Sequence, residues 1–217
     1  MKIGIFGGTF NPIHYGHLRA AEEVRERFDL TKIIFIPSKN PPLKTQDLLD
    51  SVHRYKMTEL ALSGNSFFEI SDIEFKGQGK SYSVQTLEEL RSIFHGTTLY
   101  FILGIDAFLE IPTWWQPERL ISLVDFIVIS RPSFKFVDLL SSPYIGASKN
   151  ELESLDKAGL ELHTTALKGN RAMMAFRIPL IDISATEIRR RVMEGKSIKY
   201  LLPESVESYI ISNKLYK

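Results

Sequence analysis

The chain has 217 residues, of which 44% are hydrophobic and 24% charged, a mixture typical of a globular protein. Its 27 Lys and Arg residues nearly balance 26 Asp and Glu residues, which argues against a broad basic surface for nucleic acid. Cysteine is absent, which excludes disulfides, thiolate metal sites and a cysteine nucleophile. The apolar runs are far shorter than a membrane span, and no signal peptide is visible. We therefore expect a single cytoplasmic domain over residues 1–217, with no membrane partner.

Short apolar runs alternate with helical patterns along the chain. Five of these runs are rich in β-branched and aromatic residues: residues 3–6, 33–36, 99–103, 126–129 and, less regularly, 176–181. Such runs are typical of parallel strands buried on both faces of a sheet. Between them, apolar residues recur at helical spacing over residues 18–28 and 84–94. This alternation predicts an α/β fold with a doubly wound parallel sheet.

Two helices are predicted near the C-terminus from local signals. Ser184 and Glu187 have the spacing of a capping box, and Gly195 follows the apolar positions of that helix. Pro203 suits the first turn of a last helix. Residues 133–171 have the weakest pattern, and we interpret them as an insertion or a less regular, partly mobile segment.

Residues 7–17 read GGTFNPIHYGH and directly follow the first predicted strand. Glycines after a strand let backbone N–H groups approach an anion, and a helix N-terminus adds a favourable partial charge. His14 and His17 would share one face of the helix, and Gly16 would leave room for a bulky ligand. From spacing alone, a phosphate site and an ordinary surface or core histidine pair both stay open. Half of a zinc site is disfavoured, because no further ligand pattern accompanies the pair.

The run from Gly8 to His17 resembles the signature of the HxGH nucleotidyltransferase superfamily. That resemblance implies a Rossmann-like fold in which the two histidines contact ATP phosphates. Residues 183–189 read ISATEIR and resemble the second motif of the same superfamily. Hydroxyls and free N–H groups at a helix N-terminus, with Arg189 one turn later, are a suitable anion site. Arg190 and Arg191 are interpreted as part of a solvated helix face.

Between these motifs the chain resembles the bacterial nicotinate-nucleotide adenylyltransferases over nearly its whole length. The matching features are Pro41-Pro42 with Lys44, His53-Arg54 with Met57, Asp72 with Glu74, Ser81-Tyr82 with Thr86-Leu87, Gly104 with Asp106, Pro112-Thr113-Trp114 and Arg131-Pro132. Leu43 stands where the family commonly has His, and Ser38 stands where Asn is common. The resemblance implies adenylyl transfer from ATP to nicotinate mononucleotide, with deamido-NAD and pyrophosphate as products in NAD biosynthesis.

The same resemblance implies the site residues. The catalytic set would be His14, His17, Lys44 and Arg189. Further ATP contacts would come from Gly7, Gly8, Thr9, Phe10, Asp106, Ile183, Ser184 and Thr186. Mononucleotide contacts would come from Tyr82, Thr86, Trp114 and Trp115. Aromatic side chains suit this substrate because a flat, electron-poor pyridinium ring stacks well on them. Trp114 matches the family motif, whereas Trp115 fits a core position equally well.

Mg²⁺ is the expected cofactor, held mainly by ATP phosphates, because no carboxylate cage for a metal is visible in the sequence. A pantetheine-phosphate adenylyltransferase shares both motifs and is the nearest alternative. A non-catalytic nucleotide sensor is a second alternative. A dehydrogenase is a third, although the dinucleotide fingerprint is missing. The preference for nicotinate over nicotinamide mononucleotide and a homo-oligomeric state both stay open at this stage.

Overall fold

The computed structural model describes residues 1–42, 47–77 and 79–217. The strands are β1 (Lys2–Gly8), β2 (Lys32–Pro37), β3 (Phe68–Ile70), β4 (Thr98–Gly104), β5 (Asp125–Ile129), β6 (Leu162–Leu167) and β7 (Arg171–Phe176). The α-helices are α1 (Tyr15–Phe28), α2 (Ser51–Leu62), α3 (Ile73–Lys76), α4 (Ser83–Ile93), α5 (Ile105–Glu110), α6 (Pro117–Ile121), α7 (Lys149–Asp156), α8 (Ala185–Met193) and α9 (Glu204–Ser212). Two 3-10 helices are η1 (Ile111–Thr113) and η2 (Phe136–Ser141). Within these ranges, no helix is both long and apolar enough to cross a membrane.

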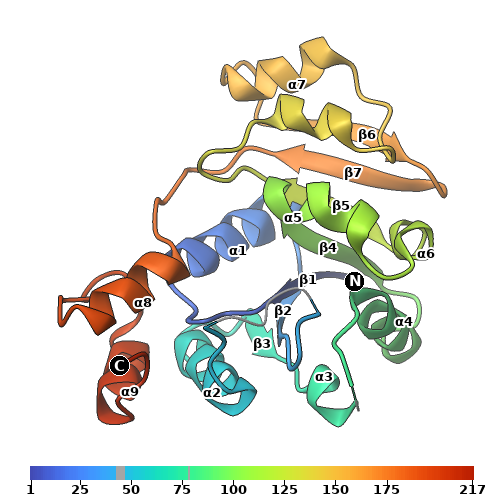
Figure 1. Ribbon diagram of the computed structural model, residues 1–217. Coiled ribbons are helices and arrows are strands. Elements are labelled where there is room, and N and C mark those ends of the chain that lie inside the picture. The colour runs from blue at the N-terminus through green and yellow to red at the C-terminus, as the bar shows by residue number, and fades with distance from the viewer. Residues whose placement is uncertain (43–46, 78) are drawn as a thin grey trace.

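A seven-stranded sheet runs through the protein in the order β3-β2-β1-β4-β5-β7-β6 (Figure 1). Neighbouring strands are parallel except β6 and β7, which are antiparallel. The chain passes from β1 outward to β2 and β3, and then returns to the other side of β1 as β4. The order therefore reverses between β1 and β4, the position at which open α/β sheets bind ligands beyond the carboxyl ends of the strands.

Helices cover both faces of the sheet (Figure 1), and each face has its own apolar core. On one face, helices α4, α5, α6 and α7 pack against strand residues such as Ile34. On the other face, α1, α2, α8 and α9 pack against residues such as Phe35. Consecutive strand residues thus enter opposite cores, which is why the strands appear as continuous apolar runs. The expected doubly wound α/β sheet is confirmed.

Most of the predicted elements are confirmed. The runs at residues 3–6, 33–36, 99–103 and 126–129 form the centres of β1, β2, β4 and β5. The two helical patterns correspond to α1 and α4, and the C-terminal signals to α8 and α9. Ser184 is the N-cap of α8, and Pro203 is the N-cap of α9.

The predicted strand at residues 176–181 is wrong, because β7 ends at Phe176. Its sequence, RAMMAF, has no β-branched residue, so the strand has little signal of its own. Pairing with β5 on one side and β6 on the other makes this segment a strand. After Phe176, Ile178 donates its N–H to the hydroxyl of Ser130 at 3.0 Å, and Pro179 has no N–H to extend a ladder.

Residues 133–171, where the sequence pattern is weakest, contain η2, α7 and β6. Ser148 caps α7, and its Oγ accepts the N–H of Glu151. The carboxylate of Asp156 accepts the N–H of Phe136 at 2.7 Å, which attaches η2 to the end of α7. Polar caps rather than a periodic apolar pattern mark these elements, and such caps are hard to distinguish from loops in a sequence.

Candidate active site

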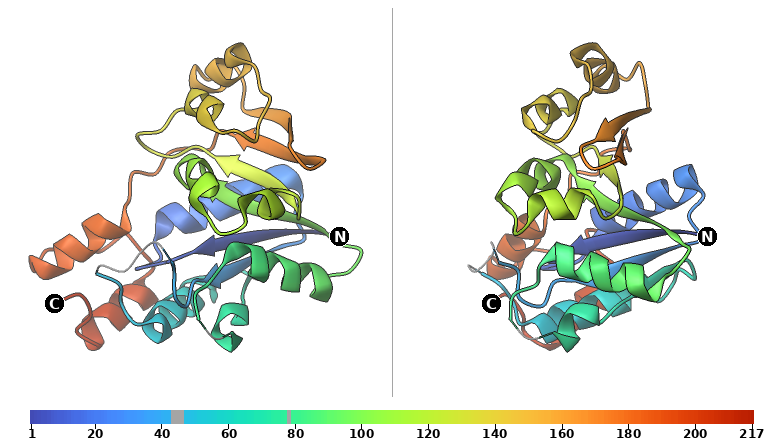
Figure 2. Two further views of the ribbon diagram at one scale, coloured as in Figure 1. Left: turned by 45° about the vertical axis from the view of Figure 1, so that its right-hand side comes forward. Right: turned by 90° about the vertical axis from the view of Figure 1, so that its right-hand side faces the viewer.

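The first motif lies at the carboxyl edge of the sheet. Gly7 and Gly8 are the last residues of β1, and His14 is the N-cap of α1. The left view of Figure 2 shows β1 running from the N-terminus toward the side where α8 and α9 lie. The expected strand–loop–helix geometry of a phosphate site is therefore present, next to the second motif.

His14 and His17 pack closely at the start of α1. Their ring centroids are 3.8 Å apart, and the backbone N–H of His14 donates to Nδ1 of His17 at 3.3 Å. His14 is only 3% exposed, and burial lowers its pKa to about 3, with a smaller contribution from the charge of Arg131. Its imidazole is therefore neutral near pH 7. Nδ1 of His14 is buried without a hydrogen-bond partner among the described residues, so it can bond to a ligand.

Gly16 allows the ring of His14 to lie against α1. A Cβ atom at Gly16 would come within 3.0 Å of Cε1 and Nδ1 of His14, and within 3.5 Å of the carbonyl oxygen of Ile183. The room expected at Gly16 for a ligand is thus occupied in part by the first histidine of the motif. A glycine between the two histidines is a packing requirement of the site.

The side chain of Phe10 packs against the second histidine of the motif. Its side chain is buried, and its ring lies edge-on to that of His17 with centroids 5.2 Å apart. Its backbone adopts a left-handed conformation with φ of 46°, which turns the chain sharply between β1 and α1. Phe10 therefore presents its backbone, rather than its side chain, to the surface of the site.

The two motifs meet directly. Nη1 of Arg189 donates to the backbone carbonyl of Asn11 at 2.8 Å, across a separation of 178 residues in the sequence. Nη2 of Arg189 lies 3.4 Å from the hydroxyl of Thr186, and Oγ of Ser184 accepts the N–H of Glu187 at 3.1 Å. The capped N-terminus of α8 and the loop after β1 therefore form one surface.

The two following arginines form ion pairs with carboxylates of α8 and its C-cap. Arg190 pairs with Glu187 and Glu194, each at 2.8 Å, and Arg191 pairs with Glu187 at 3.1 Å. These ion pairs lie along the exposed side of α8, as the solvated-face interpretation expects. Only Arg189 of the three arginines contacts the first motif.

Asp106 lies in the first turn of α5, immediately after β4. Its Oδ1 is 3.4 Å from Nε of Arg131, which follows β5, and both side chains are about one-third exposed. A Cβ at Gly104 would collide with the carboxylate of Asp106 and would lie 2.7 Å from Cγ of Arg131. Arg131 is absent from the site residues predicted from the sequence, although its positive charge contributes to the lowered pKa of His14. Its match to the family at Arg131-Pro132, directly after a buried strand, is the signal that could have assigned it to the site.

Arg54 is a second residue that sequence reasoning did not assign to the site. It is fully buried on α2 and donates to three backbone carbonyls, those of Thr9 at 2.7 Å, Lys39 at 2.9 Å and Leu49 at 2.9 Å. Burial lowers the pKa of Arg54, but a guanidinium in a protein keeps its positive charge near pH 7. Arg54 thus holds together the loops that follow β1 and β2.

The aromatic side chains expected to bind the mononucleotide differ in how deeply they are buried. Tyr82, the N-cap of α4, packs on Trp115 with ring centroids 4.8 Å apart, and Trp115 is 43% exposed. Trp114 packs against the apolar core, and its buried Nε1 has no partner within the described part of the chain. Thr86 is buried, and its hydroxyl donates to Glu74 at 2.9 Å. The accessible aromatic pair is therefore Tyr82 and Trp115.

Lys44, the remaining catalytic candidate, lies outside the described residues. Over residues 1–42, 47–77 and 79–217, no group of three or more His, Cys, Asp or Glu side chains could hold a metal ion.

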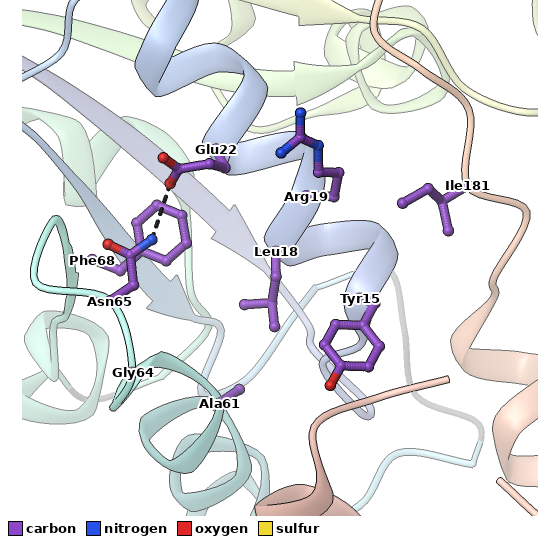
Figure 3. A pocket seen from close by; sticks show the side chains of 9 residues that line it. All are labelled: Tyr15, Leu18, Arg19, Glu22, Ala61, Gly64, Asn65, Phe68 and Ile181. Atoms are coloured by element: carbon purple, nitrogen blue, oxygen red, sulfur yellow. Dashed lines mark hydrogen bonds between the residues drawn. The ribbon is translucent and has the colours of Figure 1, made fainter. Parts of the chain in front are cut away.

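A separate hollow of about 420 Å³ lies between α1 and the C-terminal end of α2 (Figure 3). It is lined by Tyr15, Leu18, Arg19, Glu22, Ala61, Gly64, Asn65, Phe68 and Ile181, none of which is a predicted site residue.

Comparison with known proteins places the chain in a family. The sequence profile of the cytidylyltransferase-like family matches residues 5–191. A protein from Desulfitobacterium hafniense strain Y51, named probable nicotinate-nucleotide adenylyltransferase, is 44% identical over 220 residues, covering 100% of this chain and 96% of the relative. A protein of the same name from Dictyoglomus thermophilum is 44% identical over 216 residues and covers 100% of both chains. The chain belongs to the nicotinate-nucleotide adenylyltransferases, within the cytidylyltransferase-like family.

Solved structures of this family share the fold. Nicotinic acid mononucleotide adenylyltransferase from Plasmodium falciparum, complexed with NaAD, has a TM-score of 0.74 at 22% identity and covers 99% of this chain and 97% of its own. The same enzyme complexed with APC has a TM-score of 0.70 at 21% identity, covering 99% and 96%. The Rossmann-like α/β fold is thereby confirmed. Family membership also confirms that the chain is a nucleotidyltransferase, and it disfavours the dehydrogenase and nucleotide-sensor alternatives.

Proposed function

We propose that this enzyme transfers the adenylyl group of ATP to nicotinate mononucleotide, producing deamido-NAD and pyrophosphate for NAD biosynthesis. The observation that carries the proposal is the hydrogen bond from Arg189 to the carbonyl of Asn11, which joins the two motifs beside His14. The names of the relatives at 44% identity support the choice of substrates.

The proposed reaction is a direct in-line transfer. An oxygen of the mononucleotide 5′-phosphate bonds to the α-phosphorus of ATP, the bond from that phosphorus to the bridging oxygen breaks, and pyrophosphate leaves. Because a phosphate dianion is already a nucleophile, the reaction needs no general base and no covalent enzyme intermediate. Catalysis then comes from positioning the phosphates and from stabilising charge around them.

The side chains divide this work between hydrogen bonding and charge. His14 is neutral, so it contributes a hydrogen bond and no positive charge. His17 accepts the backbone N–H of His14 through Nδ1 at 3.3 Å, and we assign its side chain a hydrogen-bonding role at the phosphates. Arg189 and Arg131 supply positive charge near the phosphates, and we assign the same role to Lys44. The backbone of residues 7–10 and the N-terminus of α8 complete the ATP contacts.

Mg²⁺ is proposed to enter with ATP and to be held mainly by phosphate oxygens and water. The described residues suit this arrangement, because Asp106 is paired with Arg131 instead of joining other carboxylates in a cage. When bound, Mg²⁺ neutralises part of the phosphate charge.

Tyr82 and Trp115 are proposed to stack on the pyridinium ring of the mononucleotide. The exposed ring of Trp115, packed closely on the partly buried ring of Tyr82, suits a flat cationic ligand. Trp114 would contribute its buried Nε1–H as a hydrogen-bond donor to a ligand. The hydroxyl of Thr86 already donates to Glu74, so Thr86 would contact the mononucleotide through its methyl group.

Pyrophosphate release tests the proposed activity. The purified enzyme would be given ATP, Mg²⁺ and, in turn, nicotinate mononucleotide, nicotinamide mononucleotide and phosphopantetheine. We expect release with nicotinate mononucleotide at the highest kcat/KM. Highest release with phosphopantetheine would instead favour the pantetheine-phosphate alternative, and no release with any acceptor would contradict the proposal.

His17→Ala tests the place of the histidines in the same assay. We expect kcat to fall at least about 100-fold, because a donor aimed at the phosphates is lost. The far-ultraviolet circular dichroism should stay unchanged, since His17 is only partly buried. A well-folded His17→Ala enzyme with an ordinary rate would remove His17 from the mechanism.

A further inference from the structure

The segment after α9 folds back onto the molecule. Leu215 is buried in the core on the α1 side of the sheet, and its N–H donates to the carbonyl of Ile210 at 3.0 Å. Lys214 and Tyr216 adopt left-handed conformations, with φ of 52° and 60°. Such conformations cost free energy in residues other than glycine, so contacts made by this segment must offset that cost.

One of these contacts reaches the first motif. The hydroxyl of Tyr216 donates to Oδ1 of Asn11 at 2.9 Å, although 205 residues separate the two in the sequence. Nδ2 of Asn11 donates to the carbonyl of Asp47 at 2.8 Å, and the backbone carbonyl of Asn11 accepts from Arg189 at 2.8 Å. Asn11 therefore joins three distant segments, and its amide orientation is set by Tyr216 on one side and Asp47 on the other.

The hydroxyl of Tyr216 is suited to be a permanent donor. Arg189 and Arg54 both lie close enough for their charges to favour a phenolate, but burial outweighs them and raises the pKa of Tyr216. The group stays protonated and neutral near pH 7. A phenylalanine could fill the same space but could not hold the oxygen of Asn11.

We propose that Tyr216 is a positioning residue for the ATP phosphates, acting through Asn11 on Arg189. This inference rests on the proposed function and names a residue outside both motifs that serves the same site. The hydroxyl fixes the Asn11 side chain, the fixed Asn11 presents its carbonyl, and that carbonyl holds the guanidinium of Arg189. Without the hydroxyl, the loop after β1 loses one of its hydrogen bonds, and the carbonyl of Asn11 holds the guanidinium of Arg189 less firmly.

Tyr216→Phe tests this inference, with Tyr209→Phe as a matched control. Tyr209 also lies in the C-terminal region, and its hydroxyl is 2.9 Å from Nδ1 of His53 and makes no contact with Asn11. We expect Tyr216→Phe to lower kcat/KM for ATP about tenfold, the usual effect of losing one buried hydrogen bond. The KM for nicotinate mononucleotide should stay within about twofold, and the control should change neither value by more than about twofold.

A second measurement separates this inference from the proposed function. The dissociation constant of a non-hydrolysable ATP analogue, measured by calorimetry, needs no acceptor and therefore no assumption about the second substrate. We expect Tyr216→Phe to weaken analogue binding and Tyr209→Phe to leave it unchanged. If the wild-type enzyme binds the analogue but releases no pyrophosphate with nicotinate mononucleotide, the acceptor assignment fails while Tyr216 is still judged by binding.

Asn11→Ala tests the route of the effect. Because Tyr216 is inferred to act through Asn11, the double variant should bind the analogue no more weakly than Asn11→Ala alone. Additive losses in the double variant would overturn this route. ATP parameters of Tyr216→Phe equal to those of Tyr209→Phe would overturn the inference itself. If Tyr216→Phe proves too unstable to assay, a full-strength analogue affinity in Asn11→Ala would overturn it and a weakened one would support it.

Discussion

His14 combines deep burial with a hydrogen-bonding role at the start of α1. Its pKa is lowered to about 3, from 6.5 for an exposed histidine, chiefly because burial disfavours the charged ring. In the proposed mechanism, Arg131 and Arg189 would therefore supply the positive charge for phosphate binding, and the imidazole of His14 would supply a hydrogen bond. A neutral ring also avoids repulsion with the positive charge of Arg131, which contributes to the lowered pKa of His14.

The buried His14 should make folding stability depend on pH. Between pH 6.5 and about 3 the unfolded chain binds a proton at this position and the folded chain does not, so stability falls as the pH falls through this window. From pH 7 to pH 5 the loss should be about 2 kcal/mol. Urea unfolding of the wild type and of His14→Gln at pH 7 and pH 5 measures this loss of stability. The variant should lose about 2 kcal/mol less between these pH values, and parallel losses in both proteins would contradict the prediction.

At the scale of elements, the site depends on how closely α1 approaches its neighbours. The loop after β1 is held by Arg54, Arg189 and Tyr216, which come from three different helices or their ends. Helix α1 begins where His14 turns inward, and Gly16 in its first turn leaves the space for that ring. Helix α1 and the loop before it are therefore positioned by side chains from other helices as well as by the cap of α1.

Gly16→Ala should damage the site without unfolding the helix. Alanine favours a helix over glycine by about 1 kcal/mol, but its Cβ would press on the ring of His14, which has little room to move. We expect kcat/KM for ATP to fall at least about tenfold. Gly146→Ala is the control, since a Cβ there meets nothing within 4 Å. Full activity in Gly16→Ala would show that the ring of His14 can shift freely.

At the scale of the whole molecule, the loop after β1 meets the start of α8 and the last residues of the chain at the carboxyl edge of the sheet. Motif residues before α1 and at the start of α8 contact each other, and both helices pack on the same face of the sheet. A polyphosphate bound between the two motifs would contact segments that lie 178 residues apart in the sequence. Ligand binding should therefore stabilise the fold as a whole rather than one loop.

Thermal unfolding with and without ATP and Mg²⁺ measures this coupling. At a ligand concentration of 100 times Kd, we expect the wild-type Tm to rise by about 5–10 °C. Arg189→Met should lose most of this rise because the charge that joins both motifs is gone. Arg190→Met, on the same helix but paired with Glu187 and Glu194, should keep it. Equal ligand-induced shifts in the two variants would contradict a specific role for Arg189.

The sequence alone was sufficient for the features that local chemistry determines. Strands buried on both faces are continuously apolar, so four of the five predicted runs are strands in the structure. Capping residues and glycines predicted the start of α8 and the turn after β1, because those preferences act within a few residues. The two motifs were sufficient to indicate a nucleotidyltransferase, and the residues between them indicated the nicotinate-nucleotide family; the comparisons confirm both.

Other features depend on contacts between residues far apart, and only the tertiary structure decided them. The weakly patterned segment RAMMAF became β7 because β5 and β6 pair with it. Exposure distinguished Trp115 from Trp114, and three distant carbonyls gave the buried Arg54 its partners. The contacts of Asn11 with Tyr216 and Arg189 likewise cross about the whole length of the chain. No local pattern records them, because their partners are brought together only when both faces of the sheet are covered.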